Sequence, residues 1–211
     1  MIIAQSEFVK SVDFAFFFII GISVFFLVLI TGLMIYFVIK YNRKRNPKAK
    51  NIHGNVGLEI LWTAIPTVLV LFMFYFGWVG YKEMSSIPED SMVVNVSAQM
   101  WKFSFKYDNG KVSDTLYVPV DRPVKVELNS IDVNHAFYIP AFRLKKDIIP
   151  GKANTAWFTA TEVGSHPIFC AEYCGLNHSY MYTEVVVLSL DDFIAWSNGG
   201  ATQTVNVLNK N

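Results

Sequence analysis

Two long apolar runs occupy the first half of the chain. Residues 14–39 form a run of 26 without a charged side chain, and residues 60–81 form another of 22. At a rise of about 1.5 Å per residue, a helix of either length exceeds the ~30 Å hydrocarbon core of a bilayer. A cleaved signal peptide would have an apolar region of only about 7 to 15 residues. The pattern therefore predicts two transmembrane helices, over about 14–39 and 60–81, the first an uncleaved anchor.

From residue 89 onward, apolar residues alternate with polar ones, which is the period of half-buried β-strands. Residues 101–107 alternate aromatic side chains with Lys and Ser, and an Asp-Asn-Gly turn follows, which predicts a hairpin. Residues 124–129 alternate in the same way, and residues 183–190 read as a final strand. Short strands at this spacing are typical of a sandwich or barrel. We predict a transmembrane hairpin in residues 1–88 and an all-β domain in residues 89–211.

The predicted loop between the two spans, residues 40–58, is basic. Its first part, residues 40–50, carries six basic residues and no acid. Because short basic loops stay on the cytoplasmic side, both chain ends and the β domain are expected on the outer side. Residues 1–88 hold 8 basic and 4 acidic groups, whereas residues 89–211 hold 10 and 13, a split that the net charge of +1 hides. We expect membrane lipid, and no nucleic acid, to contact the loop, and we assign no role to His53.

Two thiols, an imidazole and a thioether lie within twelve residues, at Cys170, Cys174, His178 and Met181. Sulfur and imidazole donors favour copper over magnesium or calcium, which prefer oxygen. A blue copper centre needs two His, one Cys and a weak axial Met, and His135 is the natural candidate for the second imidazole. Cys170 is then surplus to a single-ion site, and a second thiolate could bridge two ions. The pattern predicts a dinuclear copper centre.

A disulfide between Cys170 and Cys174 is the alternative, since paired cysteines on the oxidising side of a membrane are disulfides by default. A bridge that closes three intervening residues removes little chain entropy, and it would leave His178 and Met181 unexplained. We therefore expect reduced thiols and copper delivery by another protein.

These residues resemble subunit II of haem-copper cytochrome c oxidases, which carries the dinuclear copper A centre. The resemblance covers nearly the whole chain and implies a cupredoxin-like Greek-key barrel or sandwich for the β domain. The positions that match the family's motifs are Asp132, His135, Pro140, Leu144, Lys145, Asp147, Pro150, Gly151, Cys170, Glu172, Cys174, Gly175, His178, Ser179 and Met181.

The resemblance implies a full ligand set. Cys170 and Cys174 would bridge two coppers, and His135 and His178 would complete the equatorial donors. Met181 would lie weakly on one copper. The backbone carbonyl of Glu172 would bind the other copper, and its side chain would reach a magnesium ion shared with subunit I.

Two further residues match functional positions of the family. Glu59 resembles the acid at the mouth of a proton pathway, and the alternative is an interfacial acid that ends a helix. Trp101 resembles the aromatic residue through which cytochrome c delivers its electron, and the alternative is a core aromatic. The chain departs from the family at His166, where Tyr is frequent, and we expect an outer-sphere or solvated role for this histidine rather than a copper ligand.

The implied function is that of the second subunit of a terminal cytochrome c oxidase. It would accept electrons from cytochrome c and pass them to haem in subunit I, for oxygen reduction coupled to proton translocation. This chain lacks ligands for haem and copper B, so the oxygen site is expected in subunit I, with subunit III as a further partner. We expect a multi-pass protein of the bacterial inner membrane, rather than the mitochondrial one, with a periplasmic C-terminal domain.

Three alternatives remain at this stage. The second subunit of a quinol oxidase would share the architecture but lack the copper ligands. A membrane-anchored copper chaperone would have a thioredoxin-like α/β pattern and usually a single span. A structural membrane protein with a disulfide would bind no metal.

Overall fold

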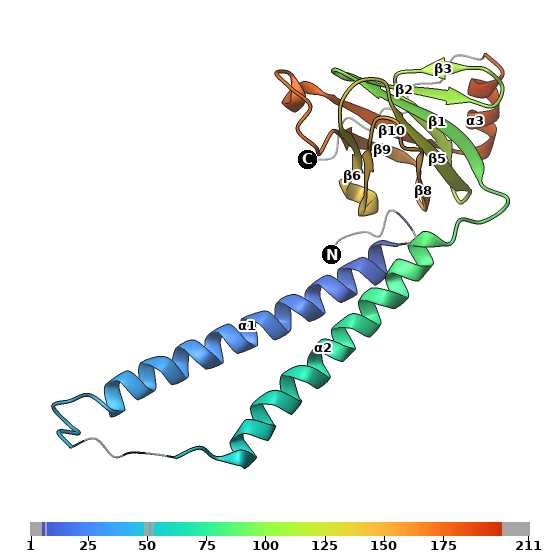
Figure 1. Cartoon of the computed structure of the whole chain (residues 1–211). Coiled ribbons are helices and arrows are strands. Elements are labelled where there is room, and N and C mark those ends of the chain that lie inside the picture. The colour runs from blue at the N-terminus through green and yellow to red at the C-terminus, as the bar shows by residue number, and fades with distance from the viewer. Residues whose placement is uncertain (1–5, 7, 49–50, 52, 200–211) are drawn as a thin grey trace, which may run out of the picture. The chain divides into compact units, whose positions relative to one another are not determined.

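The structure, a computed structural model, describes residue 6, residues 8–48, residue 51 and residues 53–199 of the 211-residue chain. Figure 1 shows two long helices and a β domain. The elements are α1 (Val9–Lys40), α2 (Val56–Ser85), β1 (Met92–Gln99), β2 (Lys102–Tyr107), β3 (Val112–Ser113), β4 (Leu116–Pro119), β5 (Pro123–Ser130), β6 (His135–Ile139), η1 (Pro140–Phe142), β7 (Leu144–Ile148), β8 (Asn154–Thr159), β9 (Gly164–Phe169), η2 (His178–Tyr180), β10 (Tyr182–Leu188) and α3 (Leu190–Ser197).

The chain divides into two compact units. One unit is Ser11–Tyr81, and the other joins the β domain to the residues up to Lys10 and from Lys82 onward. The start of α1 and the end of α2 therefore belong to the same unit as the strands.

The two predicted apolar helices are confirmed, and each extends a few residues beyond its apolar run. The Asn55 side chain accepts a hydrogen bond from the Leu58 N–H at 3.1 Å, which caps the start of α2. The ring of Phe76 in α2 lies 5.2 Å from Phe14 and 5.5 Å from Phe18 in α1, so the helices pack as an antiparallel pair. Both are long and apolar enough to cross a membrane, and no residue in the most apolar 18-residue stretch of either helix is buried.

The β domain is a sandwich of two five-stranded sheets, with strand orders β3-β2-β1-β5-β8 and β4-β10-β9-β6-β7. β1 pairs in parallel with β5, and β10 pairs in parallel with β4. The alternation over β2 was interpreted correctly, because Phe103 and Phe105 are buried between the sheets. Their rings lie 6.3 and 6.5 Å from Phe137 of the facing sheet. The predicted hairpin joins β2 to β3 through a turn in which Gly110 adopts a φ of +83°.

One predicted strand end is wrong. The last strand ends at Leu188 and the helix α3 begins at Leu190, whereas the sequence pattern was read as strand through Leu190. The Ser189 hydroxyl accepts the Asp192 N–H at 3.2 Å, a helix-capping contact that a Ser-x-x-Asp pattern can signal. The indole of Trp196 in α3 then stacks on Tyr117 at 4.5 Å.

The sequence also did not reveal how the helix ends contact the strands. Phe8, just before α1, is 1% exposed, and its ring packs edge-on against Trp157 of β8 at 4.7 Å. The same indole donates its N–H to the Met84 carbonyl in the last turn of α2 at 3.0 Å. A single buried tryptophan thus contacts both chain segments that connect the β domain to the helices.

Candidate metal centre

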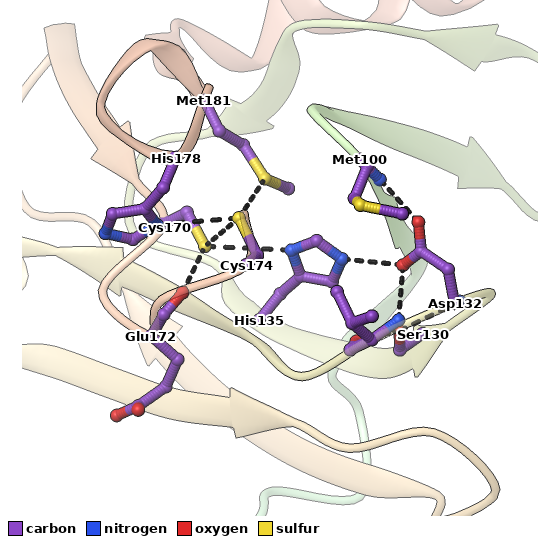
Figure 2. A network of polar contacts seen from close by, with 10 residues as sticks. Met100, Ser130, Asp132, His135, Cys170, Glu172, Cys174, His178 and Met181 are labelled. Carbon is purple, nitrogen blue, oxygen red and sulfur yellow. Dashed lines mark hydrogen bonds and ion pairs between the residues drawn. The ribbon is translucent and has the colours of Figure 1, made fainter. Parts of the chain in front are cut away.

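The candidate metal centre lies at one end of the sandwich, where three loops meet. β1 and β5 are parallel neighbours, so the turn after β1 and the loop after β5 leave the sheet at the same edge. His135 is the first residue of β6, Cys170 directly follows β9, and Met181 directly precedes β10. The fold therefore brings the distant histidine to the loop that carries the two cysteines, as Figure 2 shows.

The two cysteine sulfurs are close but not bonded. Cys170 Sγ and Cys174 Sγ lie 3.8 Å apart, well beyond the S–S bond length of about 2.05 Å, and both cysteines are free. They are 7% and 4% exposed, respectively. The arrangement is that of two buried thiols facing a common point, not of a disulfide.

Each thiol has an imidazole beside it. His135 Nδ1 lies 3.7 Å from Cys170 Sγ, and His178 Nδ1 lies 3.5 Å from Cys174 Sγ. Sulfur at about 2.3 Å and nitrogen at about 2.0 to 2.1 Å from one tetrahedral ion would lie about 3.5 to 3.6 Å apart, close to both separations. The spacing therefore fits side chains that share metal ions.

Two weaker donors complete the cluster. Met181 Sδ lies 3.7 Å from Cys174 Sγ, and this methionine is 1% exposed. The backbone carbonyl oxygen of Glu172 lies 3.3 Å from Cys170 Sγ. The Cys170 N–H donates to the Met181 carbonyl at 3.0 Å, which closes the loop around these donors.

The local environment controls the protonation of two groups. Burial, together with a hydrogen bond and charge interaction with Cys170, raises the pKa of Cys174 to about 12. Burial alone would raise the pKa of Asp132 as well, but hydrogen bonds from the Met100 N–H, His135 and the Val133 N–H lower it to about 2. A neutral thiol thus lies near a charged carboxylate.

Trp101 lies beside the metal loop but outside the donor set. It occupies the turn between β1 and β2, and a Cβ placed on Gly175 would lie 3.5 Å from its indole. Gly175, with a φ of +118°, directly follows Cys174. The indole N–H is buried and has no hydrogen-bond partner among the described residues. The sequence showed Gly175 only as a motif position after the second cysteine. It did not show that this glycine has a positive φ and lies close to the Trp101 indole.

Glu59 belongs to the helical unit. It lies in the first turn of α2, on a helix face where Thr63 and Thr67 follow at intervals of four residues. These three polar residues line a shallow groove together with apolar side chains of the same helix. The structure therefore places Glu59 at the head of a polar stripe on an otherwise apolar helix.

The Glu172 carboxylate has a partner within the chain. It pairs with Lys145 at 2.7 Å, and the same ammonium pairs with Asp147 at 2.8 Å. Magnesium prefers octahedral coordination by several oxygen atoms. Two carboxylates that share a lysine do not provide this, so the predicted magnesium ion would need ligands from another subunit.

His166 is outside the cluster. It lies on β9, and its ring is 5.3 Å from Phe142. Burial lowers its pKa, although Glu162 opposes this. Among the described residues, the side chains close enough to hold a metal ion together are His135, Cys170 and Cys174, and His166 is not one of them. His53 lies exposed in the loop between the helices.

Two long apolar helices and a cupredoxin-like sandwich, with a buried cluster of thiol, imidazole and thioether groups, define a membrane protein with a candidate metal site. Comparison with known families makes this specific. The family described as "Cytochrome C oxidase subunit II, periplasmic domain" matches residues 70–189, and the one described as "Cytochrome C oxidase subunit II, transmembrane domain" matches residues 3–77. The chain belongs to the cytochrome c oxidase subunit II family.

Similar proteins agree with this. Cytochrome c oxidase subunit 2 of Synechocystis sp. is 28% identical over 93% of this chain and 74% of its own length. The subunit of the same name from Thermostichus vulcanus is 31% identical over 84% of this chain and 70% of its own length. The crystal structure of the periplasmic domain of subunit II of cytochrome oxidase (CoxB) of Bradyrhizobium japonicum is 30% identical, with a TM-score of 0.51, over 54% of this chain and 95% of that one. The protein is therefore a membrane protein with a periplasmic domain, and it is a subunit of an oxidoreductase.

Proposed function

We propose that this chain accepts electrons from cytochrome c at a dinuclear copper A centre and passes them to subunit I of the oxidase. The observation that supports this best is the number and type of donors gathered at one end of the sandwich. Two thiols, two imidazoles, one thioether and one backbone carbonyl converge there, at Cys170, Cys174, His135, His178, Met181 and Glu172.

The donor count favours two metal ions over one. A blue copper ion takes two imidazoles, one thiolate and a weak axial ligand, which would leave a thiolate and one further donor unused. Two four-coordinate ions need eight bonds. Two bridging thiolates supply four of these, and the remaining four donors supply the others.

The chain's own residues hold and shield this centre. Cys170, Cys174 and Met181 are buried, so they exclude water from the metal side of the loop. His135 is the first residue of one strand and Met181 directly precedes another, so the sandwich can keep the ligand positions unchanged. Bound copper would supply one-electron transfer, and rigid ligands keep the cost of that transfer low.

The placement of two side chains supports a route for the electron. Trp101, whose indole would lie 3.5 Å from a Cβ placed on Gly175 beside Cys174, is the proposed point of arrival from cytochrome c. His178 is half-buried, so its ring can reach both the cluster and a partner, and it is the proposed exit toward haem in subunit I. The excess of acid in residues 89–211 suits a basic donor protein, whose association should weaken with salt.

The remaining parts of the proposal concern the membrane. Both long helices would span the bacterial inner membrane, beside subunit I, which supplies haem and copper B, and subunit III. Glu59, which heads the polar stripe of α2, would stand at the mouth of a proton pathway. A magnesium ion between Glu172 and subunit I would require partner ligands in addition to that carboxylate. The three alternatives fit less well. A quinol oxidase subunit needs no such donors, a thioredoxin-like chaperone would not be a β-sandwich, and a structural disulfide would join two sulfurs that lie 3.8 Å apart.

Copper analysis of the full chain tests the central proposal. The detergent-solubilised protein, with its thiols reduced and then loaded with copper, is expected to hold about two coppers per chain. Electron spin resonance should show one unpaired electron shared by both ions. The variant His166→Gln, which removes an imidazole outside the cluster, should behave like the unchanged chain. One localised Cu(II) per chain would contradict the dinuclear centre.

A charge-neutral replacement tests the role of Glu59. In the assembled oxidase, Glu59→Gln is expected to lower turnover by up to about 10²-fold, because a positioned proton-transfer group is lost. Copper content should not change. Glu83→Gln, at the opposite end of α2, is the matched control. Oxygen consumption and proton uptake would be measured together, and unaltered turnover in Glu59→Gln would exclude the role.

A further inference from the structure

We infer that Asp132 is a positioning residue whose one carboxylate fixes both a metal-binding histidine and the turn that carries Trp101. The inference rests on the proposed function, which gives both of these groups their tasks. The sequence placed Asp132 only as a neighbour of His135 within a motif, without a role of its own.

One carboxylate oxygen orients the histidine. Asp132 Oδ1 lies 2.8 Å from His135 Nε2 and also accepts the Val133 N–H at 2.6 Å. A carboxylate only accepts hydrogen bonds, so the imidazole nitrogen that faces it carries the hydrogen. His135 Nδ1 is then left with its lone pair toward Cys170 Sγ at 3.7 Å. The aspartate therefore selects the tautomer that can bind a metal at Nδ1.

The other carboxylate oxygen holds the turn between β1 and β2. Asp132 Oδ2 accepts the Met100 N–H at 2.7 Å, across 32 residues of sequence. Figure 2 shows this carboxylate between the Met100 backbone and the His135 ring. The residue that follows Met100 is Trp101, so its position depends on this hydrogen bond.

The loop that carries Cys174 and Gly175 lies close to the same turn. A Cβ on Gly175 would lie 3.5 Å from the indole of Trp101 and 3.7 Å from Met100 Sδ. The turn thus lies against the loop that carries Cys174 while Asp132 holds its backbone. A misplacement of about 1 Å in reacting groups can lower a rate about 10²-fold. A single carboxylate that positions both Trp101 and His135 would therefore help to keep electron transfer fast.

The geometry predicts two measurable properties of the unchanged chain. The Met100 amide should exchange slowly with solvent, although the Met100 side chain is 44% exposed. The single proton of neutral His135 should reside on Nε2. A freely exchanging amide or a proton on Nδ1 would overturn the inference without any variant.

The variant Asp132→Asn keeps the shape of the side chain but offers one acceptor oxygen and an NH₂ group. It cannot accept from both His135 Nε2 and the Met100 N–H through two oxygens. In the metal-free full chain in detergent, nitrogen NMR of the four histidines and amide exchange by mass spectrometry are expected to show the loss of one contact, because the single amide oxygen can keep the other. Either His135 should populate the Nδ1–H tautomer, or the Met100 amide should exchange about tenfold faster.

Asp90→Asn removes the same charge from an exposed position of the same domain and is expected to change neither property. If Asp132→Asn leaves both properties unaltered, the shared role is wrong. In the copper-loaded chain, Asp132→Asn should also alter the nitrogen coupling of His135 and the reduction potential. If Asp132 contributed only surface charge, its replacement would change these two quantities no more than Asp90→Asn does. If the unchanged chain binds no copper, the proposed function fails, but the metal-free measurements still decide the role of Asp132.

Discussion

Replacing Cys170 by serine is expected to lower the copper content from about two ions per chain to about one. The loss removes one of the two thiolates that would bridge the ions. Cys174, His178, Met181 and His135 would remain, which is the ligand set of a blue copper site. The shared-electron spectrum should give way to that of one localised Cu(II), and electron acceptance from cytochrome c should fall by about 10²-fold. Copper analysis and electron spin resonance of the full chain check both statements.

The two cysteines are not equivalent, and this sharpens the comparison. His178 Nδ1 and Met181 Sδ lie 3.5 and 3.7 Å from Cys174 Sγ, whereas Cys170 Sγ has His135 and the Glu172 carbonyl as neighbours. Cys174→Ser should therefore lose the blue copper set and retain less copper than Cys170→Ser. Equal copper content and equal spectra in the two variants would argue against bridging by both sulfurs. A spectrum of Cys170→Ser that matches the unchanged chain would do the same.

The sequence was sufficient for the helices and for much of the sandwich. Uninterrupted apolar runs of this length are typical of membrane-spanning helices. A period of two over residues 103–107 places three aromatic side chains on one face of a strand. Both patterns are local, so no knowledge of distant contacts was needed. The cysteine loop was readable for the same reason, because four soft donors lie within twelve residues.

The surroundings of those donors were not readable in the same way. The sequence named His135 as the distant imidazole, but this residue lies 35 residues from Cys170, and only the fold brings the two side chains within 3.7 Å. The hydrogen bond from Met100 to Asp132 and the nearness of Trp101 to Gly175 bring together three loops that have no common sequence pattern. Such contacts depend on how the strands end, and this is a property of the whole fold.

Charge pairing also escaped the sequence. Lys145 and Asp147 were known only as motif positions, yet the lysine bonds to Glu172 across 27 residues. The pair gives the Glu172 side chain a partner inside this chain, so a shared magnesium ion would have to compete with an ammonium group. The backbone carbonyl of the same residue is unaffected and still points to Cys170.

Acid is expected to weaken copper binding steeply, because loading must remove a proton from Cys174. In the metal-free chain, burial and the neighbouring Cys170 raise the pKa of Cys174 to about 12, so this thiol is protonated throughout the neutral range. Metal binds the thiolate, so each bound site releases this proton. The apparent affinity should therefore fall about tenfold per pH unit from this group alone, or about 10²-fold between pH 8 and pH 6.

Competition with a Cu(I) chelator of known pH dependence measures that affinity, and calorimetry in two buffers of different ionisation enthalpy counts the protons released. The same raised pKa has the opposite consequence for the metal-free fold. Because the unfolded thiol ionises near its ordinary pKa of about 8.5, the metal-free domain keeps this contribution to stability below that pH. It loses the contribution as the pH rises toward 12, the range in which the thiolate becomes available for copper. A copper affinity independent of pH between 6 and 8, with no proton released, would show that Cys174 is already ionised or is not a ligand.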